Sequence, residues 1–437
     1  MKKEIIHGFS KFSRGAKIES LAKFTGQARD YMQHFLSFLH PDPVVQETLD
    51  GFSENTISNF PFPLGLAPNF LVNGKMYMVP MAIEESSVVA AASASAKFWA
   101  ANGGFRCTVK GVEKPGQLHL ASSLGYDFIK NTLDEKWHRI LETLEPITGK
   151  MKKRGGGILG YELIDFNREI KDYYQLRITF DTRDAMGANF INSCLEAIGK
   201  ELENLSIVKN KPGIKVIMAI LSNYTPGCVV SAKVQCPVEQ LNSLSKNYPG
   251  DEMAERIKLA VDIAAIDTYR AVTHNKGIMN GVDAVLVATG NDYRAVEAAA
   301  NAYAARDGRY SSLSGANITG GMFSVELEMP LAVGTVGGLT ANHPQANKAF
   351  EILGKPSATE LMCIVAATGL ANNFAAVKAL VSTGIQSGHM RMHLDNILDR
   401  FHASKEEKMV AREHFKDKTI SFSKVETFIN VWRKTSK

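Results

Sequence analysis

Alternating apolar and polar residues predict strands in several parts of the chain. Phe70–Val72 and Met76–Val79 are short alternating runs on either side of Asn73-Gly74, a dipeptide typical of a two-residue hairpin turn. Tyr174–Phe180 and Met322–Pro330 alternate in the same way. Because side chains on a strand point to opposite faces in turn, each of these runs predicts a half-buried strand.

Longer periodic segments predict helices. Ser86 or Ser87 can cap one of them, and Asn102-Gly103-Gly104 stops it. The predicted helices cover Val88–Ala101, Phe190–Leu205, Glu255–Val272 and Pro356–Val381.

The stretch His274–Asp292 reads HNKGIMNGVDAVLVATGND and combines an apolar run with polar, glycine-rich flanks. The run Ala284–Ala288 predicts a short buried strand between two turns. Lys276 then lies in one turn, where it could stabilise an oxyanion, although a lone Lys-Gly is more often an ordinary loop lysine. Asp292 precedes another helical pattern, so it can also cap a helix.

Size and composition place the chain among globular proteins of two or three domains. It has 437 residues, 45% of them hydrophobic, and a net charge of +5 spread along the sequence, which gives no reason to expect nucleic acid. The N-terminal lysines are not followed by an apolar run, so no secretory signal is expected. The longest apolar segment, Glu360–Val381, is interrupted by Asn372, Asn373 and Lys378, so we expect no membrane span and a cytoplasmic protein.

The cysteines and histidines do not predict a metal site. Five cysteines lie apart without a CxxC spacing, as expected for reduced core thiols. His389 and His393 could share a helix face, but Met follows His389 and no third ligand suggests itself, so we expect no metal.

Two further segments carry candidate chemistry. Asp184–Asn189, DAMGAN, follows a predicted strand and precedes a predicted helix, a geometry in which backbone amides can meet a pyrophosphate. It is not GxGxxG, so it is weak as a general nucleotide motif. Lys150–Arg154 is a dense basic cluster before three glycines; a solvated basic loop is an equally good reading of each member.

These segments resemble 3-hydroxy-3-methylglutaryl-CoA reductases, specifically the bacterial type called class II. The resemblance covers about residues 50 to 400 and rests on motifs in the family's order. They are VPMAIEESSVVAAASASAKFWAANGG, DAMGAN, HNKGIMNG with GND, the glycine-rich Leu331–Gly338, and SGHM.

The resemblance implies reduction of 3-hydroxy-3-methylglutaryl-CoA to mevalonate and CoA with two nicotinamide cofactors, or the reverse reaction. Lys276 would stabilise the oxyanion, with Asp292 holding and tuning it. His389 would protonate the departing thiolate, and Glu85 would supply a proton as mevaldehyde is reduced. Judged alone, Glu85 at a helix start would be an ordinary first-turn charge.

The resemblance also implies the binding residues. Ser87, Arg270 and Asn280 match substrate-contacting positions of the family. For the cofactor, the matching residues are Asp184, Met186, Gly187, Asn189 and Lys150. In the pattern that uses NADH an acidic residue precedes the three glycines, whereas Ile147–Lys150 has none and gains a lysine, which favours NADPH and leaves NADH possible.

The implied fold is a mixture of α+β and α/β architecture. A large helical and sheet-containing domain for the CoA substrate and for dimerisation would comprise residues 1–109 and 223–383. Residues 110–222 would form a small inserted NAD(P)-binding domain unlike the Rossmann fold, and 384–437 a mobile C-terminal flap. A homodimer with shared active sites is implied, with a higher oligomer possible; Glu54–Ser58 matches the family's dimer-contact signature only in part.

Two other functions fit some of the residues. A CoA-thioester acyltransferase could use Cys107, which follows the Gly103-Gly104 turn, as its nucleophile. A non-catalytic assembly protein could have kept the fold, but it would have no reason to retain Glu85, Lys276, Asp292 and His389 together.

Overall fold

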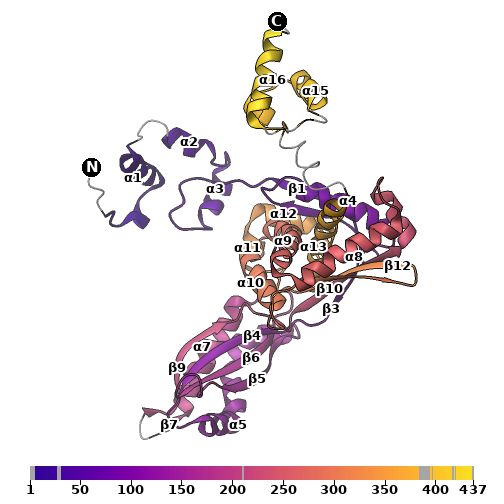
Figure 1. Ribbon diagram of the computed structural model, residues 1–437. Helices are drawn as coiled ribbons and strands as arrows, with labels where there is room; N and C mark the ends of the chain where they lie inside the picture. Colours follow the sequence, from indigo (N-terminus) through magenta and orange to yellow (C-terminus); the bar gives the residue numbers. More distant parts are fainter. Residues whose placement is uncertain are drawn as a thin grey trace.

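Two four-stranded antiparallel sheets organise the computed structural model (Figure 1), which describes residues 5–26, 31–208, 211–382, 394–395, 397–415, 418 and 420–435. The first sheet has the strand order β11-β12-β10-β3. Its strands are β3 (Arg106–Val109), β10 (Val229–Pro237), β11 (Ser314–Thr319) and β12 (Met322–Pro330). The predicted strand Met322–Pro330 is therefore confirmed, and the mixed helix and sheet fold is confirmed with it.

Long helices share one hydrophobic core with this first sheet. The principal helices are α4 (Val88–Ala100), α8 (Gly250–Ile266), α9 (Thr268–Ala288) and α13 (Ala358–Val381). By length and composition α13 could cross a membrane, but 67% of its most apolar stretch is buried within the protein. It therefore serves as a core helix in this fold.

Helices α9 and α13 approach each other closely because glycines face the contact. A Cβ atom on Gly281 would lie 2.6 Å from the Thr368 carbonyl oxygen, and one on Gly369 would lie 2.8 Å from Val282 Cγ2. Both distances are below van der Waals contact, so a larger residue at either position would force the helices apart.

The second sheet, with the order β5-β6-β4-β9, has its own core beneath three helices. The strands are β4 (Lys114–Ala121), β5 (Gly157–Asp165), β6 (Tyr173–Asp181) and β9 (Lys215–Leu221). The helices are α5 (Tyr126–Thr143), α6 (Glu145–Lys153) and α7 (Ala188–Leu205). All strand pairs are antiparallel, so the sheet differs from the parallel Rossmann sheet.

The predicted hairpin is present as β1 (Leu64–Val72) and β2 (Lys75–Ala82), which pair antiparallel around Asn73-Gly74. It leads directly into α4. Shorter elements lie between the strands and helices already named. They are β7 (Ile207–Val208), β8 (Lys211–Pro212), a 3₁₀ segment Val238–Leu244, α10 (Tyr293–Ala304), α11 (Gly338–Asn342) and α12 (Pro344–Ile352).

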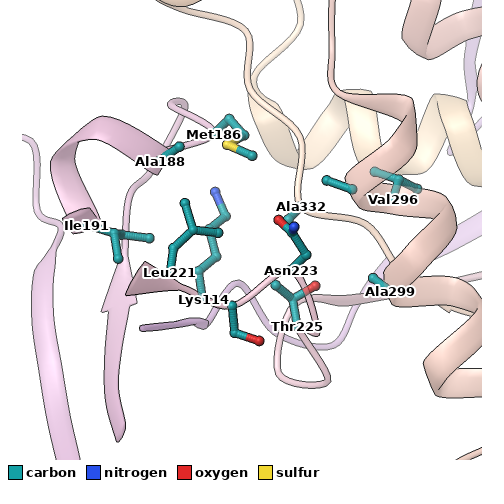
Figure 2. A pocket seen from close by; sticks show the side chains of 12 residues that line it. Lys114, Met186, Ala188, Ile191, Leu221, Asn223, Thr225, Val296, Ala299 and Ala332 are labelled. Atoms are coloured by element: carbon teal, nitrogen blue, oxygen red, sulfur yellow. The ribbon is translucent and has the colours of Figure 1, made fainter. Parts of the chain in front are cut away.

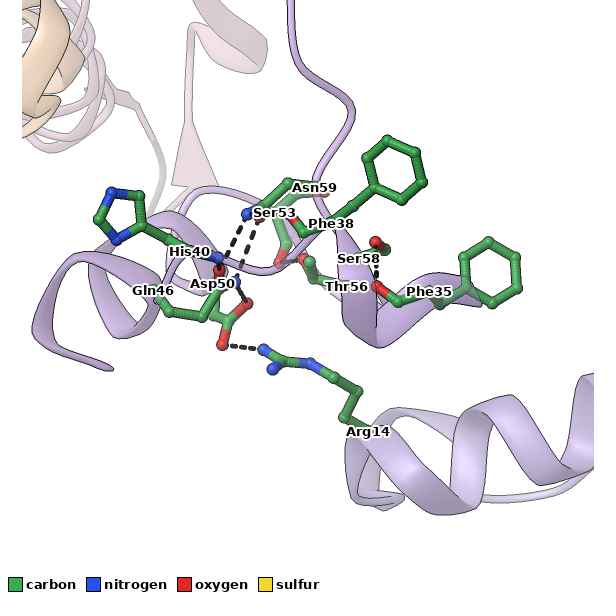
Figure 3. A network of polar contacts seen from close by, with 10 residues as sticks. All are labelled: Arg14, Phe35, Phe38, His40, Gln46, Asp50, Ser53, Thr56, Ser58 and Asn59. Atoms are coloured by element: carbon green, nitrogen blue, oxygen red, sulfur yellow. Dashed lines mark hydrogen bonds and ion pairs between the residues drawn. The ribbon is translucent and has the colours of Figure 1, made fainter. Parts of the chain in front are cut away.

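Polar contacts tie the N-terminal segment together (Figure 3). It contains a 3₁₀ turn Phe9–Lys11, α1 (Arg14–Thr25), α2 (Tyr31–Ser37) and α3 (Pro43–Asp50). Arg14 forms an ion pair with Asp50, whose carboxylate also accepts a 2.7 Å hydrogen bond from Gln46. Ser58 donates to the Phe35 carbonyl oxygen at 2.7 Å, which fixes the end of the segment Glu54–Ser58.

Near the other end of the chain, α15 (Lys405–His414) and α16 (Phe422–Thr435) pack around a small core of their own. Val425 and Ile429 are fully buried in it. The start of the predicted C-terminal flap, residues 384–393, lies outside the described residues.

Two elements predicted between residues 255 and 288 were wrong. The run Ala284–Ala288 is not a strand but the last part of α9, because a helix buried on nearly every side has the same continuous apolar run as a buried strand. The predicted helix Glu255–Val272 is interrupted at Asp267, whose carboxylate accepts a 3.0 Å hydrogen bond from the Arg270 backbone and starts α9.

The close contact between α9 and α13 makes Gly281 sensitive to substitution. We expect Gly281→Val to lower the free energy of unfolding by about 1–3 kcal/mol, because the added atoms meet the Thr368 backbone. Gly315→Val is the control: a Cβ on Gly315 meets nothing within 4 Å, so the change should stay within about 0.5 kcal/mol. Urea unfolding of both variants measures the difference, and equal effects would contradict the packing argument.

Candidate active site

Lys276 and Glu85 form an ion pair although 191 positions separate them, with 2.6 Å between Lys276 Nζ and Glu85 Oε2. Lys276 extends from α9, and Glu85 lies in the connection between β2 and α4. Their side chains are 59% and 40% exposed. The prediction that Lys276 lies in a turn was wrong, but its ammonium is open to solvent and to a ligand.

Asp292 caps α10, as one reading of the sequence predicted. Its Oδ1 atom accepts a 3.1 Å hydrogen bond from the Ala295 backbone and lies 3.5 Å from Arg294 Nε. Within the described parts of the chain, no hydrogen bond or ion pair joins Asp292 to Lys276. The structure thus brings together two of the predicted catalytic residues. The fourth, His389, lies outside the described residues.

The predicted substrate-contacting residues lie on the same two segments as Lys276 and Glu85. Asn280 follows Lys276 by one helical turn, so both side chains leave α9 on the same face. Arg270 is in the first turn of α9, where partial burial lowers its pKa. Ser87 immediately precedes α4 and has a left-handed backbone, with φ of 76°. That conformation is uncommon for a side-chain-bearing residue and is often found at functional turns.

His274 fixes α9 to the first sheet and was missed by the sequence analysis. It is 1% exposed, and its Nε2 atom lies 2.6 Å from Ser314 Oγ at the start of β11. Burial, and then the charge of Arg270, lower the pKa of His274 to about 4. The ring is therefore neutral at physiological pH. In the sequence, this role of His274 was indicated only by its position two residues before Lys276.

The DAMGAN segment forms a tight loop before α7. Gly187 has φ of 95°, and a Cβ there would lie 2.4 Å from Thr182 Cγ2, so glycine is required. Met186 lies just before it, and Asn189 is exposed in the first turn of α7. Asp184 has a structural role, because its carboxylate accepts a 2.8 Å hydrogen bond from the Ala358 backbone at the start of α13.

Lys114, a buried lysine that the sequence analysis did not identify, lies against this loop near Met186 and Ala188 (Figure 2). Lys114, at the start of β4, is 5% exposed. Its ammonium donates to Thr182 Oγ1 at 2.6 Å and to the Ala185 carbonyl oxygen at 2.9 Å. Burial lowers the pKa of Lys114. The lysine borders a small cavity of about 20 Å³ together with Met186 and Ala188.

The basic cluster lies at the end of α6, next to the DAMGAN loop. The cluster ends at Arg154, which Gly155 follows in the sequence. The Arg183 guanidinium donates a hydrogen bond to the Gly155 carbonyl oxygen. Arg183 immediately precedes Asp184, so this bond links the two loops. Lys150 is exposed on α6, available to a ligand.

Cys107, the nucleophile of the alternative function, is not suited to that role. All five cysteines are free and buried. A hydrogen bond with Cys363 and burial raise the pKa of Cys107, which keeps it a thiol. The acyltransferase reading that used Cys107 is therefore not favoured. No group of three His, Cys, Asp or Glu side chains within the described ranges could hold a metal ion.

Comparison with known proteins identifies the family. The family model for hydroxymethylglutaryl-coenzyme A reductase matches residues 16–394. The chain belongs to this family. It is 37% identical over 393 residues to the reductase of Archaeoglobus fulgidus, covering 90% of this chain and 86% of the relative. A probable reductase of Borreliella burgdorferi is 34% identical over 408 residues, covering 91% and 89%.

Solved reductase structures have the same fold. A structure of the class II reductase from Streptococcus pneumoniae, described as bound to NADPH in open conformations, has a TM-score of 0.71 and 38% identity. It covers 86% of this chain and 99% of that one. A second structure of the Streptococcus pneumoniae enzyme has a TM-score of 0.72 and 37% identity over 97% of this chain and 99% of the other. The predicted family resemblance is confirmed.

Protonation of His274 should destabilise the fold as the pH falls. Its pKa of about 4 is below the usual 6.5, so the unfolded chain binds the proton more readily and stability is lost below pH 6.5. Between pH 7 and pH 5 we expect this residue to cost about 2 kcal/mol. His274→Gln should show a flatter dependence than the unsubstituted protein in urea unfolding at both pH values. Parallel curves would contradict a neutral, buried His274.

Proposed function

We propose that Lys276 and Glu85 form the catalytic centre for reduction of 3-hydroxy-3-methylglutaryl-CoA to mevalonate and CoA. The observation that carries this proposal is their 2.6 Å ion pair, built from distant segments and open to solvent, in a chain of the reductase family. A lysine and a carboxylic acid side by side can act on the same carbonyl oxygen, one after the other. The lysine stabilises negative charge on it, and the acid delivers a proton.

The reaction needs two reductions at the same carbon. The nicotinamide cofactor, when bound, supplies a hydride in each. In the first, Lys276 stabilises the oxyanion formed from the thioester carbonyl, with Asp292 tuning the charge of that site. The C–S bond then breaks, and His389 protonates the leaving CoA thiolate. In the second, Glu85 gives a proton to the oxygen of mevaldehyde and completes the alcohol.

Substrate binding is assigned to residues on the two segments that carry this pair. Arg270 is suited to a carboxylate, since its guanidinium can form two parallel hydrogen bonds. Asn280, on the Lys276 face of α9, and Ser87, two residues after Glu85, can hydrogen bond the hydroxyl and carbonyl groups. No metal has a part in this assignment.

NADPH is the cofactor that the basic cluster fits best, with NADH as the weaker substitute. The related class II structure from Streptococcus pneumoniae is described as bound to NADPH. Here the N-terminus of α7, with Gly187 in a left-handed conformation, suits a pyrophosphate. We assign Met186, Gly187 and Asn189 to cofactor contacts and Lys150 to the 2′-phosphate. Asp184 belongs to the same loop, although its carboxylate is already bonded to α13.

The proposed domains follow the two cores. Residues 110–222 form the cofactor domain around the second sheet, 1–109 and 223–383 the substrate domain, and 384–437 the flap. The proposal includes a homodimer with shared active sites, able to assemble further. Exposed apolar side chains on one face of the hairpin offer a surface for self-association: Leu64, Leu66, Met76 and Met78, which are 42–57% exposed. We place the enzyme in the cytoplasm.

Replacing Lys276 tests the catalytic centre. Lys276→Met keeps most of the side-chain length but removes the charge, and we expect kcat to fall by at least about 10² to 10³, the usual cost of losing an oxyanion-stabilising group. Lys233→Met removes an exposed lysine of β10 and should stay within about twofold of the unsubstituted enzyme. Cofactor oxidation at saturating substrate measures both. Near-normal turnover of Lys276→Met would overturn the proposed function.

Charge reversal in the basic cluster tests cofactor choice. Lys150→Glu should raise KM for NADPH by about tenfold, the effect of one lost hydrogen bond to a charged group, and leave KM for NADH nearly unchanged. Lys130→Glu, an exposed residue of α5, makes the same charge change in the same domain and serves as the control. Equal effects on both cofactors would argue against a 2′-phosphate contact.

A further inference from the structure

Two neighbouring amides on α13 reach the two segments that carry Glu85 and Lys276. Asn372 and Asn373 are 4% and 2% exposed. Asn372 Nδ2 donates to the Val88 carbonyl oxygen at 2.9 Å, and Asn373 Nδ2 donates to the His274 carbonyl oxygen at 3.0 Å. Val88 is the first residue of α4, and His274 lies in α9.

Each bond ends close in sequence to one residue of the ion pair. Val88 follows Glu85 by three residues, and His274 precedes Lys276 by two. Because Asn372 and Asn373 are consecutive on one helix, their separation is fixed by α13 itself. The two bonds therefore set how far the Glu85 segment lies from the Lys276 segment.

The two amides are closely packed against α9 and the residues around them. A Cβ on Gly277, the residue after Lys276, would lie 3.6 Å from Asn373 Nδ2. One on Gly281 would lie 3.0 Å from Asn372 Cβ. Behind the pair, Phe374 packs on Trp99 of α4, with ring centroids 4.8 Å apart. Among the described residues, these two amides form the side-chain hydrogen bonds that join α13 to α4 and α9. A hydrogen bond depends on direction as well as fit.

We propose that Asn372 and Asn373 are positioning residues for the reductase reaction: they hold Glu85 and Lys276 at the separation that lets both reach one carbonyl oxygen. This inference rests on the proposed function of the ion pair. The amides touch neither the substrate carbonyl nor the cofactor in this assignment. They act through the backbone of α4 and α9.

Substitutions that remove the amide but keep the shape test the proposal. For Asn373→Leu and Asn372→Leu we expect kcat to fall roughly 10- to 100-fold, the effect of a misplacement of about 1 Å, with KM for both substrates within about threefold. Thr368→Val is the matched control, because it removes a buried hydrogen bond from α13 to its own Ile364 carbonyl oxygen. It should stay within about twofold in kcat. If leucine prevents folding, Asn373→Ser replaces it in the test, and the same loss in kcat is expected.

A double-mutant cycle separates positioning from general destabilisation. If Asn373 acts through Lys276, Asn373→Leu should leave the residual turnover of Lys276→Met unchanged within about twofold. An equal loss in both backgrounds, or a loss in Asn373→Leu no greater than in Thr368→Val, would overturn the proposal. Near-normal turnover of Lys276→Met alone would instead overturn the catalytic role on which the proposal rests.

Discussion

The close contact between α9 and α13 is the constraint on which the rest of the structure depends. Glycines at positions 281 and 369 let the two helix backbones approach until there is no room for a Cβ atom at either position. At that distance the buried amides of Asn372 and Asn373 reach α4 and α9 directly. The Lys276–Glu85 pair on the surface is therefore a consequence of packing beneath it. Such support is what places a catalytic group accurately.

The same helix also reaches the cofactor loop. The Ala358 backbone at the start of α13 donates to Asp184, and Asn372 lies about 21 Å further along the helix axis, at 1.5 Å per residue. Lys114 holds the other side of the loop from the second sheet. One rigid helix thus connects the proposed cofactor site with the proposed catalytic pair, so the two sheets can form separate cores and still serve one reaction.

Local patterns in the sequence predicted much of this fold and part of the site. The Asn73-Gly74 hairpin, the strand Met322–Pro330 and the cap at Asp292 depend on nearby residues, and all three are confirmed. The run Ala284–Ala288 was misread because burial on nearly every side removes the periodicity that distinguishes a helix from a strand. Lys114, His274 and the amides of α13 could not be found, since their partners lie 40 to 284 residues away in sequence.

The most direct test of the central claim follows nicotinamide absorbance and free thiol together after 3-hydroxy-3-methylglutaryl-CoA is added, in parallel with NADPH and NADH. The account predicts two cofactor molecules oxidised for each thiol released, with NADPH the faster cofactor. Thiol release without cofactor oxidation would show hydrolysis or acyl transfer and would contradict the assignment of Lys276 and Glu85 to a reductase reaction.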